Sequence, residues 1–405
     1  MNEHRARRGE ASGALNTSTS RAAISGFCAS LVGIGLARFA YTPLLPAIID
    51  AHWFDASSAA YLGAANLAGY LAGALLARPL SRVVSVVGSI RSMMVMASMA
   101  LMACAWPVSF SWFFFWRFVS GFAGGGLMVI AAPTILPHVP VARRGLVGGV
   151  IFMGIGAGIA ASGTLIPLLL QQGLATTWLG LGALALALTV VAWRGWPSEH
   201  GVAPPDAPVT HARGPEPIAL RALYIEYALN AAGLVPHMIF LVDFVAHGLG
   251  QGVQVGSEFW VLFGLGALVG PVLTGHLADR TGFGPALRLA YFIEAGAVVL
   301  PAFGLDGGWL MLSAVVVGAF TPGIVPLTLG RIHELVPHQP AAQKAAWGTA
   351  TTSFAVLQAI AAYLMSCLFA HRGADYQAIF LIGTAALSLA LALDLVVGVT
   401  VRGKR

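Results

Sequence analysis

The chain has 405 residues, of which 58% are hydrophobic and only 9% are charged, and its mean hydropathy is +0.81. This composition excludes an ordinary soluble domain and places the chain in a lipid bilayer. The formal net charge of +6 comes from basic residues gathered in short loops, so we expect no nucleic-acid partner.

Apolar segments of about twenty residues, the length that crosses about 30 Å of hydrocarbon as a helix, recur along the whole chain. We expect helices because backbone amides in lipid must be satisfied within their own segment. The twelve predicted spans are residues 22–49, 58–77, 89–106, 111–136, 145–169, 174–194, 219–246, 256–277, 285–304, 308–331, 342–369 and 376–400.

Polar segments divide these spans into two groups of six. The predicted organisation is a disordered cytoplasmic tail at 1–21, an N-terminal bundle at 22–194, a proline-rich cytoplasmic linker at 195–218, a C-terminal bundle at 219–400 and a tail at 401–405. The linker is too short to hold a nucleotide-binding domain, and the sequence lacks the G-x-x-x-x-G-K-[S/T] phosphate loop. We therefore expect no ATP hydrolysis.

The patterns of enzymes and metal sites are also missing from the sequence. Cys28, Cys104 and Cys367 all fall inside spans, without the paired spacing of a metal site or a disulfide framework. There is no G-x-S-x-G nucleophile motif. The sequence therefore predicts neither enzymatic activity nor a cofactor nor a bound metal.

Basic residues set the expected orientation of the spans. Of the 22 Lys and Arg residues, Arg38 and Arg117 lie within spans and only Arg372 lies in a loop of one side. All the others lie in the terminal segments or in the loops of the opposite side. Loops rich in Lys and Arg remain in the cytoplasm, so both termini are predicted to be cytoplasmic.

One octet occurs twice, as PHVPVARR at 137–144 and as PHQPAAQK at 337–344, and a glycine follows each copy at the same spacing. The repeat predicts two copies of one membrane unit, that is, two six-helix bundles related by pseudo-twofold symmetry. In many solute carriers such repeats enclose a central site that opens alternately to each side.

A second pair of loops resembles the signature loop of the major facilitator superfamily, G-x-x-x-D-R-x-G. The segment GHLADRTG at 275–282 matches it, whereas GALLARPL at 73–80 has Ala77 at the acidic position and Leu80 in place of the last glycine. An Asp at a helix end can dock on the positive N-terminus of a neighbouring helix or on an Arg, and such a contact can break between conformations. The expected gating residues are Asp279, Arg280, Arg78 and Arg144. A solvated charge at a helix end is the alternative for Asp279.

Two further motifs resemble those of the same superfamily. Arg117 and Phe118 begin an R-F-x-x-G-x-x-x-G pattern, and the glycines of residues 145–163 match much of the antiporter signature of span five. The alternative is that these glycines only let helices approach closely. Together with GLARFAYTPLLP in span one and the PHxP loops, the chain is similar to the YbfB/YjiJ family of bacterial transporters.

This resemblance implies a twelve-helix, secondary active transporter of a bacterial inner membrane that works as a monomer. Its expected partners are a small-molecule substrate, protons and the surrounding lipid bilayer. The antiporter pattern slightly favours export. Uptake by proton symport is the alternative within this class, and a membrane sensor without transport is the alternative from another class.

Polar residues within spans are the candidates for the substrate site. A charge at mid-bilayer costs at least about 2.5 to 3.5 kcal/mol, so Arg38 and Arg117 need compensation. An anionic substrate could supply it, or a fixed carboxylate or backbone carbonyls could make these residues structural. Tyr41 shares the helix face of Arg38, and Asn66 in span two is expected to line the same cavity or to tie helices together.

Span seven carries a polar stripe, since Glu226, Asn230, Gly233 and His237 are spaced by four, three and four residues and share one helical face. We expect this face to meet water or the other half of the protein. Glu226 is the proposed proton-coupling carboxyl, with a position near the helix end that reaches the cytoplasm as the alternative. Asn230 and His237 are proposed to contact substrate.

The remaining acids within spans, Glu294 and Asp394, are expected to be braced by Arg288 or Arg402. Thr349, Thr352 and Gln358 in span eleven are predicted to line the cavity or to tie helices together.

Overall fold

A computed structural model of the chain describes residues 19–139, 144–197, 218–304, 307–337, 339–371 and 375–402. Within these ranges the structure is helical and contains no strand. Twelve helical segments there are long and apolar enough to cross a membrane, and each predicted span agrees with one of them to within four residues at either end. The twelve-helix fold predicted from the sequence is therefore confirmed.

The first half begins with span one, residues 19–50, in which a π-helical turn and a short α-helix are distinguished. Its elements are η1 (Leu31–Leu36), α2 (Tyr41–Asp50), α3 (Ala56–Val84), α4 (Val86–Ala103), α5 (Phe110–Ile135), η2 (Leu136–His138), α6 (Arg144–Leu170) and α7 (Leu174–Ala192).

The second half begins with span seven, residues 218–248, which is divided in a similar way. Its elements are α8 (Ile218–Val235), η4 (Pro236–Phe240), α9 (Leu241–Asp243), η5 (Phe244–Gly248), α10 (Gly252–Thr281), α11 (Phe283–Val298), η6 (Leu300–Phe303), α12 (Gly307–Leu335), α13 (Pro340–His371) and α14 (Tyr376–Arg402).

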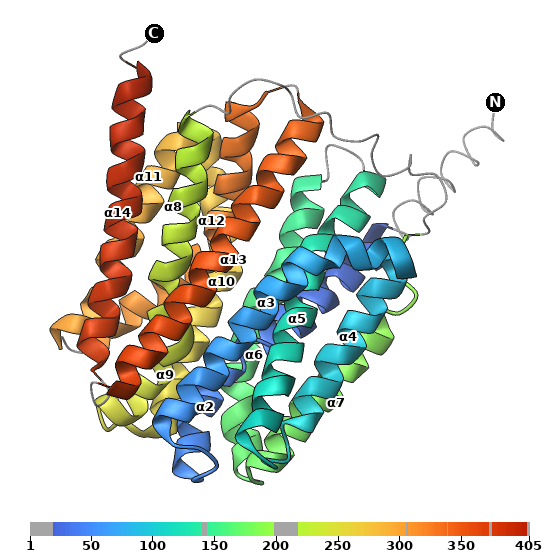
Figure 1. The fold of residues 1–405 in the computed structure, drawn as a ribbon, viewed down its shortest axis with the longest axis vertical. Helices are drawn as coiled ribbons and strands as arrows, with labels where there is room; N and C mark the ends of the chain where they lie inside the picture. Colours follow the sequence, from blue (N-terminus) through green and yellow to red (C-terminus); the bar gives the residue numbers. More distant parts are fainter. Residues whose placement is uncertain are drawn as a thin grey trace, which may run out of the picture.

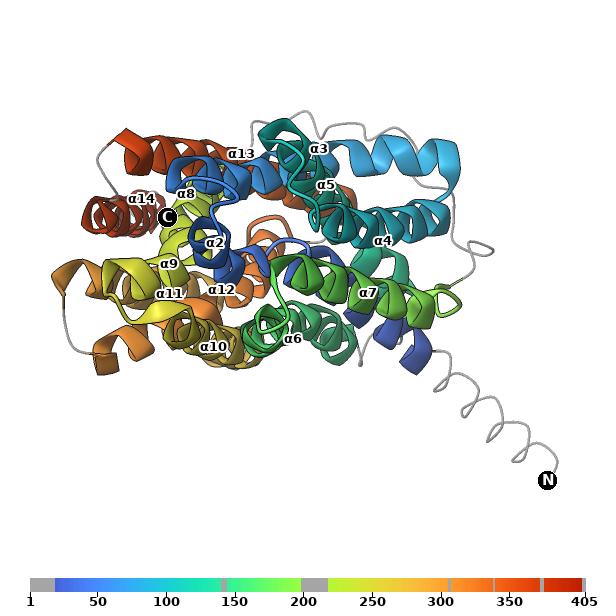
Figure 2. The same cartoon turned by 90° about the horizontal axis from the view of Figure 1, so that it is seen from below.

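The two halves lie side by side, with the blue to green helices on one side and the yellow to red helices on the other (Figure 1). Two long helix pairs join them, α6 with α10 and α3 with α13, as the view from below also shows (Figure 2). Span one begins and α14 ends at the same end of the bundle, which we call the terminal end. The opposite end, where α2 ends at Asp50, is called the far end.

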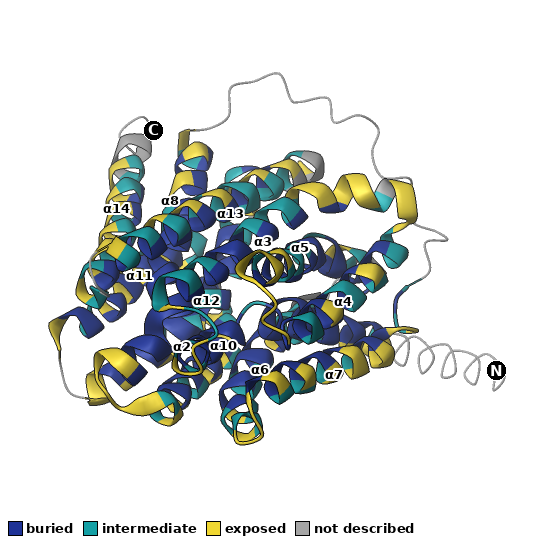
Figure 3. Ribbon diagram, turned by 60° about the horizontal axis from the view of Figure 1, so that its bottom comes forward, coloured by how far each residue is buried: buried dark blue, intermediate teal, exposed yellow. Residues whose placement is uncertain are grey.

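Burial follows the faces that the helices turn toward one another (Figure 3). Large apolar side chains remain exposed on the outward faces, among them Val190, Phe292 and Leu364 at about two thirds of their full exposure. Such a surface would aggregate in water but suits lipid. Most of both predicted tails (1–18 and 403–405), most of the linker (198–217) and parts of both repeated octets (140–143 and 338) lie outside the described residues. Residues 19–21, predicted to belong to the disordered tail, are helical and begin span one.

The pair α3 and α5 crosses at a seam of glycines. A Cβ on Gly121 would lie 1.9 Å from the carbonyl oxygen of Asn66, and a Cβ on Gly125 would lie 2.0 Å from that of Tyr70. The matching pair in the second half, α10 with α12, repeats this seam, since a Cβ on Gly270 would lie 1.9 Å from the carbonyl oxygen of Ala319. The glycines of the R-F-x-x-G-x-x-x-G pattern therefore let two backbones touch.

Gly121→Ala is expected to force α3 and α5 apart, because the added methyl overlaps backbone that cannot turn aside. Overpacking of this kind costs about 1–3 kcal/mol, and the melting temperature of the purified protein should fall. Gly149→Ala is the matched control, since a Cβ on this helical glycine meets nothing within 4 Å. Equal melting temperatures for the two variants would contradict the seam.

The first span of each half departs from regular α-helix near its middle. In span one, the amides of Ala37 and Phe39 donate to carbonyls five residues back, those of Val32 and Ile34, and residues 37–40 form turns before α2 begins. In span seven, η4 and η5 are π-helical and Pro236 contributes no amide hydrogen. Such breaks release backbone carbonyls inside a membrane protein, where they must find other donors.

Candidate functional site

The break in span one is held through the carbonyl oxygen of Ala37. Arg117 Nη1 donates to it at 3.0 Å, Asn66 Nδ2 donates to it at 3.2 Å, and Ser120 Oγ lies 3.3 Å away. Asn66 Nδ2 also lies 2.8 Å from Ser120 Oγ and 3.2 Å from the carbonyl oxygen of Arg117. Polar groups from α3 and α5 thus replace the helical hydrogen bond that the break removes.

Arg117 is bound by neutral groups. Its side chain is almost completely buried, its guanidinium carbon lies 4.2 Å from the ring centroid of Tyr41, and Tyr41 Oη donates to the carbonyl oxygen of Ala59 at 2.7 Å. No carboxylate within the described residues forms an ion pair with Arg117. A carbonyl and an aromatic face satisfy this cation, as expected for a residue that ties helices together.

Arg38 follows Ala37 in the chain and lies between the two halves. Its Nη2 donates to Gln358 Oε1 of α13 at 2.6 Å, and its guanidinium carbon lies 4.9 Å from the ring centroid of Tyr70 and 5.2 Å from that of Phe39. Its Nε is buried without a partner. No acidic side chain among the described residues forms an ion pair with Arg38.

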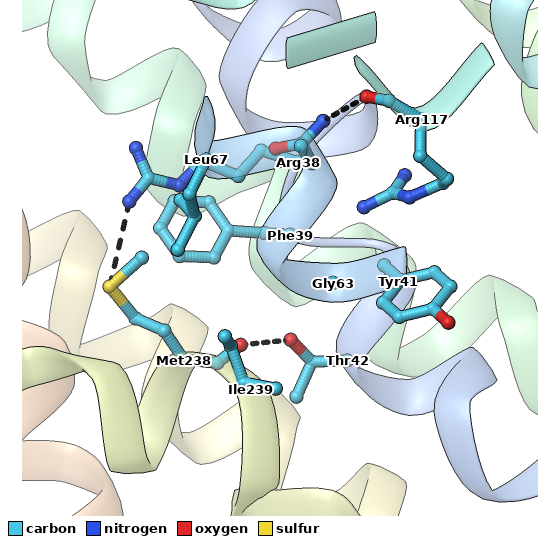
Figure 4. A pocket seen from close by; sticks show the side chains of 10 residues that line it. Arg38, Phe39, Tyr41, Thr42, Gly63, Leu67, Arg117, Met238 and Ile239 are labelled. Atoms are coloured by element: carbon cyan, nitrogen blue, oxygen red, sulfur yellow. Dashed lines mark hydrogen bonds between the residues drawn. The ribbon is translucent and has the colours of Figure 1, made fainter. Parts of the chain in front are cut away.

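Two pockets meet at Arg38, Phe39 and Met238, which line both of them. The smaller, of about 280 Å³, extends toward the far end and is also lined by Tyr41, Thr42, Gly63, Asn66, Leu67, Arg117 and Ile239 (Figure 4). The larger, of about 550 Å³, lies between the halves and is also lined by Ile34, Tyr70, Met128, Ile155, Tyr227, Leu234, Thr321, Pro322, Val325, Trp347, Thr351, Phe354 and Gln358.

Met238 joins the two halves at this point. Its carbonyl, in the broken region of span seven, accepts a hydrogen bond from Thr42 Oγ1 of span one (Figure 4). Its sulfur lies 3.7 Å from Arg38 Nη2 and 3.6 Å from Gln358 Nε2. Thr42 and Met238 could not be found from the sequence, because a threonine and a methionine among apolar residues give no signal of their own.

The polar stripe of span seven faces its own bundle, and the expectation that it meets water or the other half is wrong. Asn230 Nδ2 donates to Glu294 Oε2 of α11 at 2.5 Å, and His237 Nε2 lies 2.8 Å from Ser313 Oγ of α12. A Cβ on Gly233 would press on Leu387 of α14. Neither Asn230 nor His237 lines the two pockets.

Glu226 also lies within the second bundle. Its residue is 3% exposed, so its carboxyl does not reach water at the helix end in this conformation. The charged groups that act on it are Asp394, Arg331 and Arg288. Arg288 Nε bonds to Asp394 Oδ2 at 2.5 Å, which confirms the expected bracing of Asp394.

Glu294 differs from that expectation. It is completely buried, its only hydrogen-bonding partner in the described structure is Asn230, and its Oε1 is left without a partner. Tyr291, one turn before it, also has a buried hydroxyl without a partner. Span seven and α11 therefore share a buried polar cluster that contains a carboxyl and, among the described residues, no paired cation.

The expected gating residues are only partly described. Arg78 and Arg280 are exposed, and the side chains of Asp279 and Arg144 lie outside the described residues. In the described structure another acid docks at a helix N-terminus, since Glu334 Oε1 accepts from the amide of Phe283, at the start of α11, at 3.0 Å. Glu334 Oε2 also bonds to Arg331 Nη1 at 2.8 Å.

The glycines that resemble an antiporter signature have packing roles. A Cβ on Gly154 would lie 2.3 Å from the carbonyl oxygen of Phe27, and one on Gly158 would lie 2.5 Å from Cα of Gly35, both in span one. On the other side of α6, a Cβ on Gly156 would lie 2.6 Å from the amide nitrogen of Leu268 in α10. Packing thus accounts for these glycines without reference to the direction of transport.

A twelve-helix fold of two halves, with pockets between them and broken first helices, defines a secondary transporter of the major facilitator type. One similar solved structure is the crystal structure of a point mutant of the nucleoside transporter NupG, with a TM-score of 0.70 and 14% sequence identity over 94% of this chain and 99% of that chain. At this identity the likeness shows the fold. No curated protein sequence matches the chain.

Residues 30–395 match the family described as "Uncharacterised MFS-type transporter YbfB". The chain belongs to this family, and it is a multi-pass membrane transporter and not an enzyme. The sequence resemblance to the YbfB/YjiJ family is thereby confirmed.

Arg117→Leu is expected to destabilise the protein, because the buried carbonyl of Ala37 loses one donor and the ring of Tyr41 loses its cation. Leaving such groups poorly satisfied costs about 1–3 kcal/mol. Arg91→Leu is the matched control, since Arg91 also bonds to a carbonyl, that of Trp193, and also packs on a ring, but at the surface. Thermal unfolding of both variants measures the difference, and a larger loss in Arg91→Leu would refute the structural role of Arg117.

Proposed function

We propose that this transporter moves a small organic anion and that Arg38 binds its negative group. The observation that carries the proposal is a cation in the pocket between the halves whose described partners are all neutral. Burying a charge without a counterion is costly, and a substrate carboxylate would supply the missing charge. The carboxylate would displace Gln358 Oε1 from Arg38 Nη2 and could also bond to the free Nε.

The rest of the larger pocket suits a substrate with a flat, apolar ring. Tyr227 and Phe354 lie 4.6 Å apart between ring centroids, and Trp347 lies 6.2 Å from Tyr227. These rings and Tyr70 line the larger pocket together with Arg38. Aromatic walls bind planar groups by stacking, so an aromatic or heteroaromatic carboxylate fits both features of the pocket.

The same contacts provide a route to alternating access. Arg38 belongs to span one, whereas Gln358 and Met238 belong to the other half, so the substrate would enter at a bond that crosses between the halves. A ligand shifts a conformational equilibrium only through contacts that differ between the states. Replacement of the bond from Arg38 to Gln358 is such a difference.

Proton coupling is proposed for Glu226. Its support is the burial of an acid in span seven, the helix that also carries the break beside the pocket. A movement of α8 relative to Arg331 or to the pair of Arg288 and Asp394 would change the charges around this carboxyl, and with them its affinity for a proton. Asn230 and His237 are proposed to act on the substrate through the position of span seven.

Export in exchange for protons is the proposed direction. Its support is the resemblance of span five to the antiporter signature, which favours export slightly because packing also accounts for the glycines of that pattern. The terminal end is proposed to face the cytoplasm of a bacterial cell on account of its Lys and Arg residues. The direction of substrate flux in vesicles with an imposed pH gradient decides between export and uptake by symport.

Arg38→Ala is expected to abolish transport and leave the amount of folded protein unchanged, because Arg38 has no acidic partner among the described side chains and bonds to neutral side chains. Thermal-shift measurements with benzoate, hexanoate and benzylamine test the chemistry of the site. Benzoate should stabilise the wild type most and should not stabilise Arg38→Ala. Normal transport by Arg38→Ala, or equal stabilisation by benzylamine, would refute the anion site.

Glu226→Gln is expected to bind substrate normally and to lose concentrative transport driven by a pH gradient, because the amide cannot carry a proton. Uptake of labelled substrate into everted vesicles, with and without a pH gradient, measures the effect. Glu258→Gln serves as the control, since that acid is exposed near the start of α10 and has no part in the site. If Glu226→Gln still concentrates solute with normal pH dependence, Glu226 is not the coupling group.

A further inference from the structure

A chain of ionisable groups crosses between the halves at the far end. His247 of η5 lies with Nε2 2.9 Å from Asp50 Oδ1, at the end of α2, and with Nδ1 2.7 Å from Asp243 Oδ1, at the end of α9. The hydroxyl of Tyr376, the first residue of α14, donates to Asp243 Oδ2 at 2.6 Å. Asp50 belongs to the first half, and the other three residues belong to the second.

The bond from His247 to Asp50 joins the two halves of the protein. Among the described ion pairs it is the one that connects the two halves, since the others lie within the second half. It lies where α2 packs against α9, at the far end of the contact between the halves. In an alternating-access transporter this contact must separate when the far side opens.

The geometry of the imidazole ring bears on its protonation. A neutral imidazole has one N–H donor and one lone-pair acceptor, and an ionised carboxylate can only accept. Both ring nitrogens lie within hydrogen-bonding distance of carboxylate oxygens, so each nitrogen needs a hydrogen to donate. A neutral imidazole has only one such hydrogen. An imidazolium that donates to both acids meets the requirement.

We propose that His247 is a proton-binding site that latches the far side closed. The imidazolium connects Asp50 of the first half to Asp243 of the second, and loss of its proton releases Asp50. Because the proton is bound in the latched state, that state is favoured at a pH at which the imidazole is protonated and both acids are ionised, and it is lost as the pH rises further.

The contacts show which of the two bonds breaks. Asp243 is 1% exposed and is also fixed by Tyr376, whereas the Asp50 side chain is 57% exposed and can be solvated by water. A neutral His247 therefore keeps its N–H toward Asp243 and turns a lone pair on Nε2 toward the carboxylate of Asp50. Lone pair and carboxylate repel each other, and the bond that crosses between the halves is the one lost.

Other charged groups near this end do not replace His247. The ionisable side chain at the start of α10, which packs against η5, is Glu258, and it is exposed. His52 bonds through Nδ1 to the carbonyl oxygen of Ile49 in its own segment. Asp375 accepts from the amide of Ala378 at the start of α14. In the described structure, the groups that face the imidazole are Asp50, Asp243 and, through Asp243, Tyr376.

Spin-label distances in lipid nanodiscs test the latch. Cysteines placed at Val108 and Phe303, two exposed positions in opposite halves next to the far-end loops, carry the labels, and Cys28, Cys104 and Cys367 are replaced by alanine. Between pH 6 and pH 9.5 we expect the ratio of short to long distances to fall about fivefold or more, the usual size of such couplings.

His247→Gln should remove this pH dependence, because an amide does not titrate in this range. Asp50→Asn, an exposed position, should remove it as well, and His52→Gln should keep it as the matched control. A distance distribution of the wild type that does not change with pH, or a full pH response in His247→Gln, would overturn the latch. The latch depends on alternating access alone, so a failed Arg38 or Glu226 assignment leaves this measurement unaffected.

Discussion

The structure depends on how a break in span one is satisfied inside the membrane. The carbonyl of Ala37 leaves the helical hydrogen-bonding pattern and is bound by Arg117 and Asn66, which come from two other helices. Because these donors fix the orientation of residue 37, they also direct the next residue, Arg38, toward the other half. Arg117 therefore binds the backbone, whereas Arg38 lies in the pocket, where a substrate can reach it.

Span seven repeats this arrangement with a different partner. Its break at residues 236–240 releases the carbonyl of Met238, and the donor that binds it, Thr42, comes from the opposite half. The two broken helices therefore satisfy part of each other's backbone where the pockets meet. Any movement that separates the halves at this point must supply a new donor for Met238, which couples the pocket to the contact between the halves.

The sequence was sufficient for the fold and for only part of the site. Length and hydropathy located all twelve spans, because lipid imposes one secondary structure on every segment. The spacing of Glu226, Asn230 and His237 correctly placed them on one face, but periodicity does not show what lies opposite, and α11, α12 and α14 cover that face. Bonds to carbonyls, such as those at Ala37 and Met238, leave no pattern in side-chain chemistry. His247 and Asp50 are 197 positions apart in the chain and had no motif to connect them.

The contact of α6 with α10 has a mechanical consequence. Gly156 meets the backbone of Leu268, and Gly264 meets that of Ala160, so main chain touches main chain at this level of the contact. One turn away, Trp260 Nε1 of α10 donates to Ser162 Oγ of α6 at 3.1 Å. Helices with large side chains pack ridges into grooves and resist tilting, because the ridges must leave the grooves before one helix can rotate on the other. Around Gly156 and Gly264 no such ridges stand in the way, so this part of the junction can act as a pivot about which one half rocks, with the hydrogen bond from Trp260 to Ser162 as its fixed point, while lipid keeps the outer surface covered.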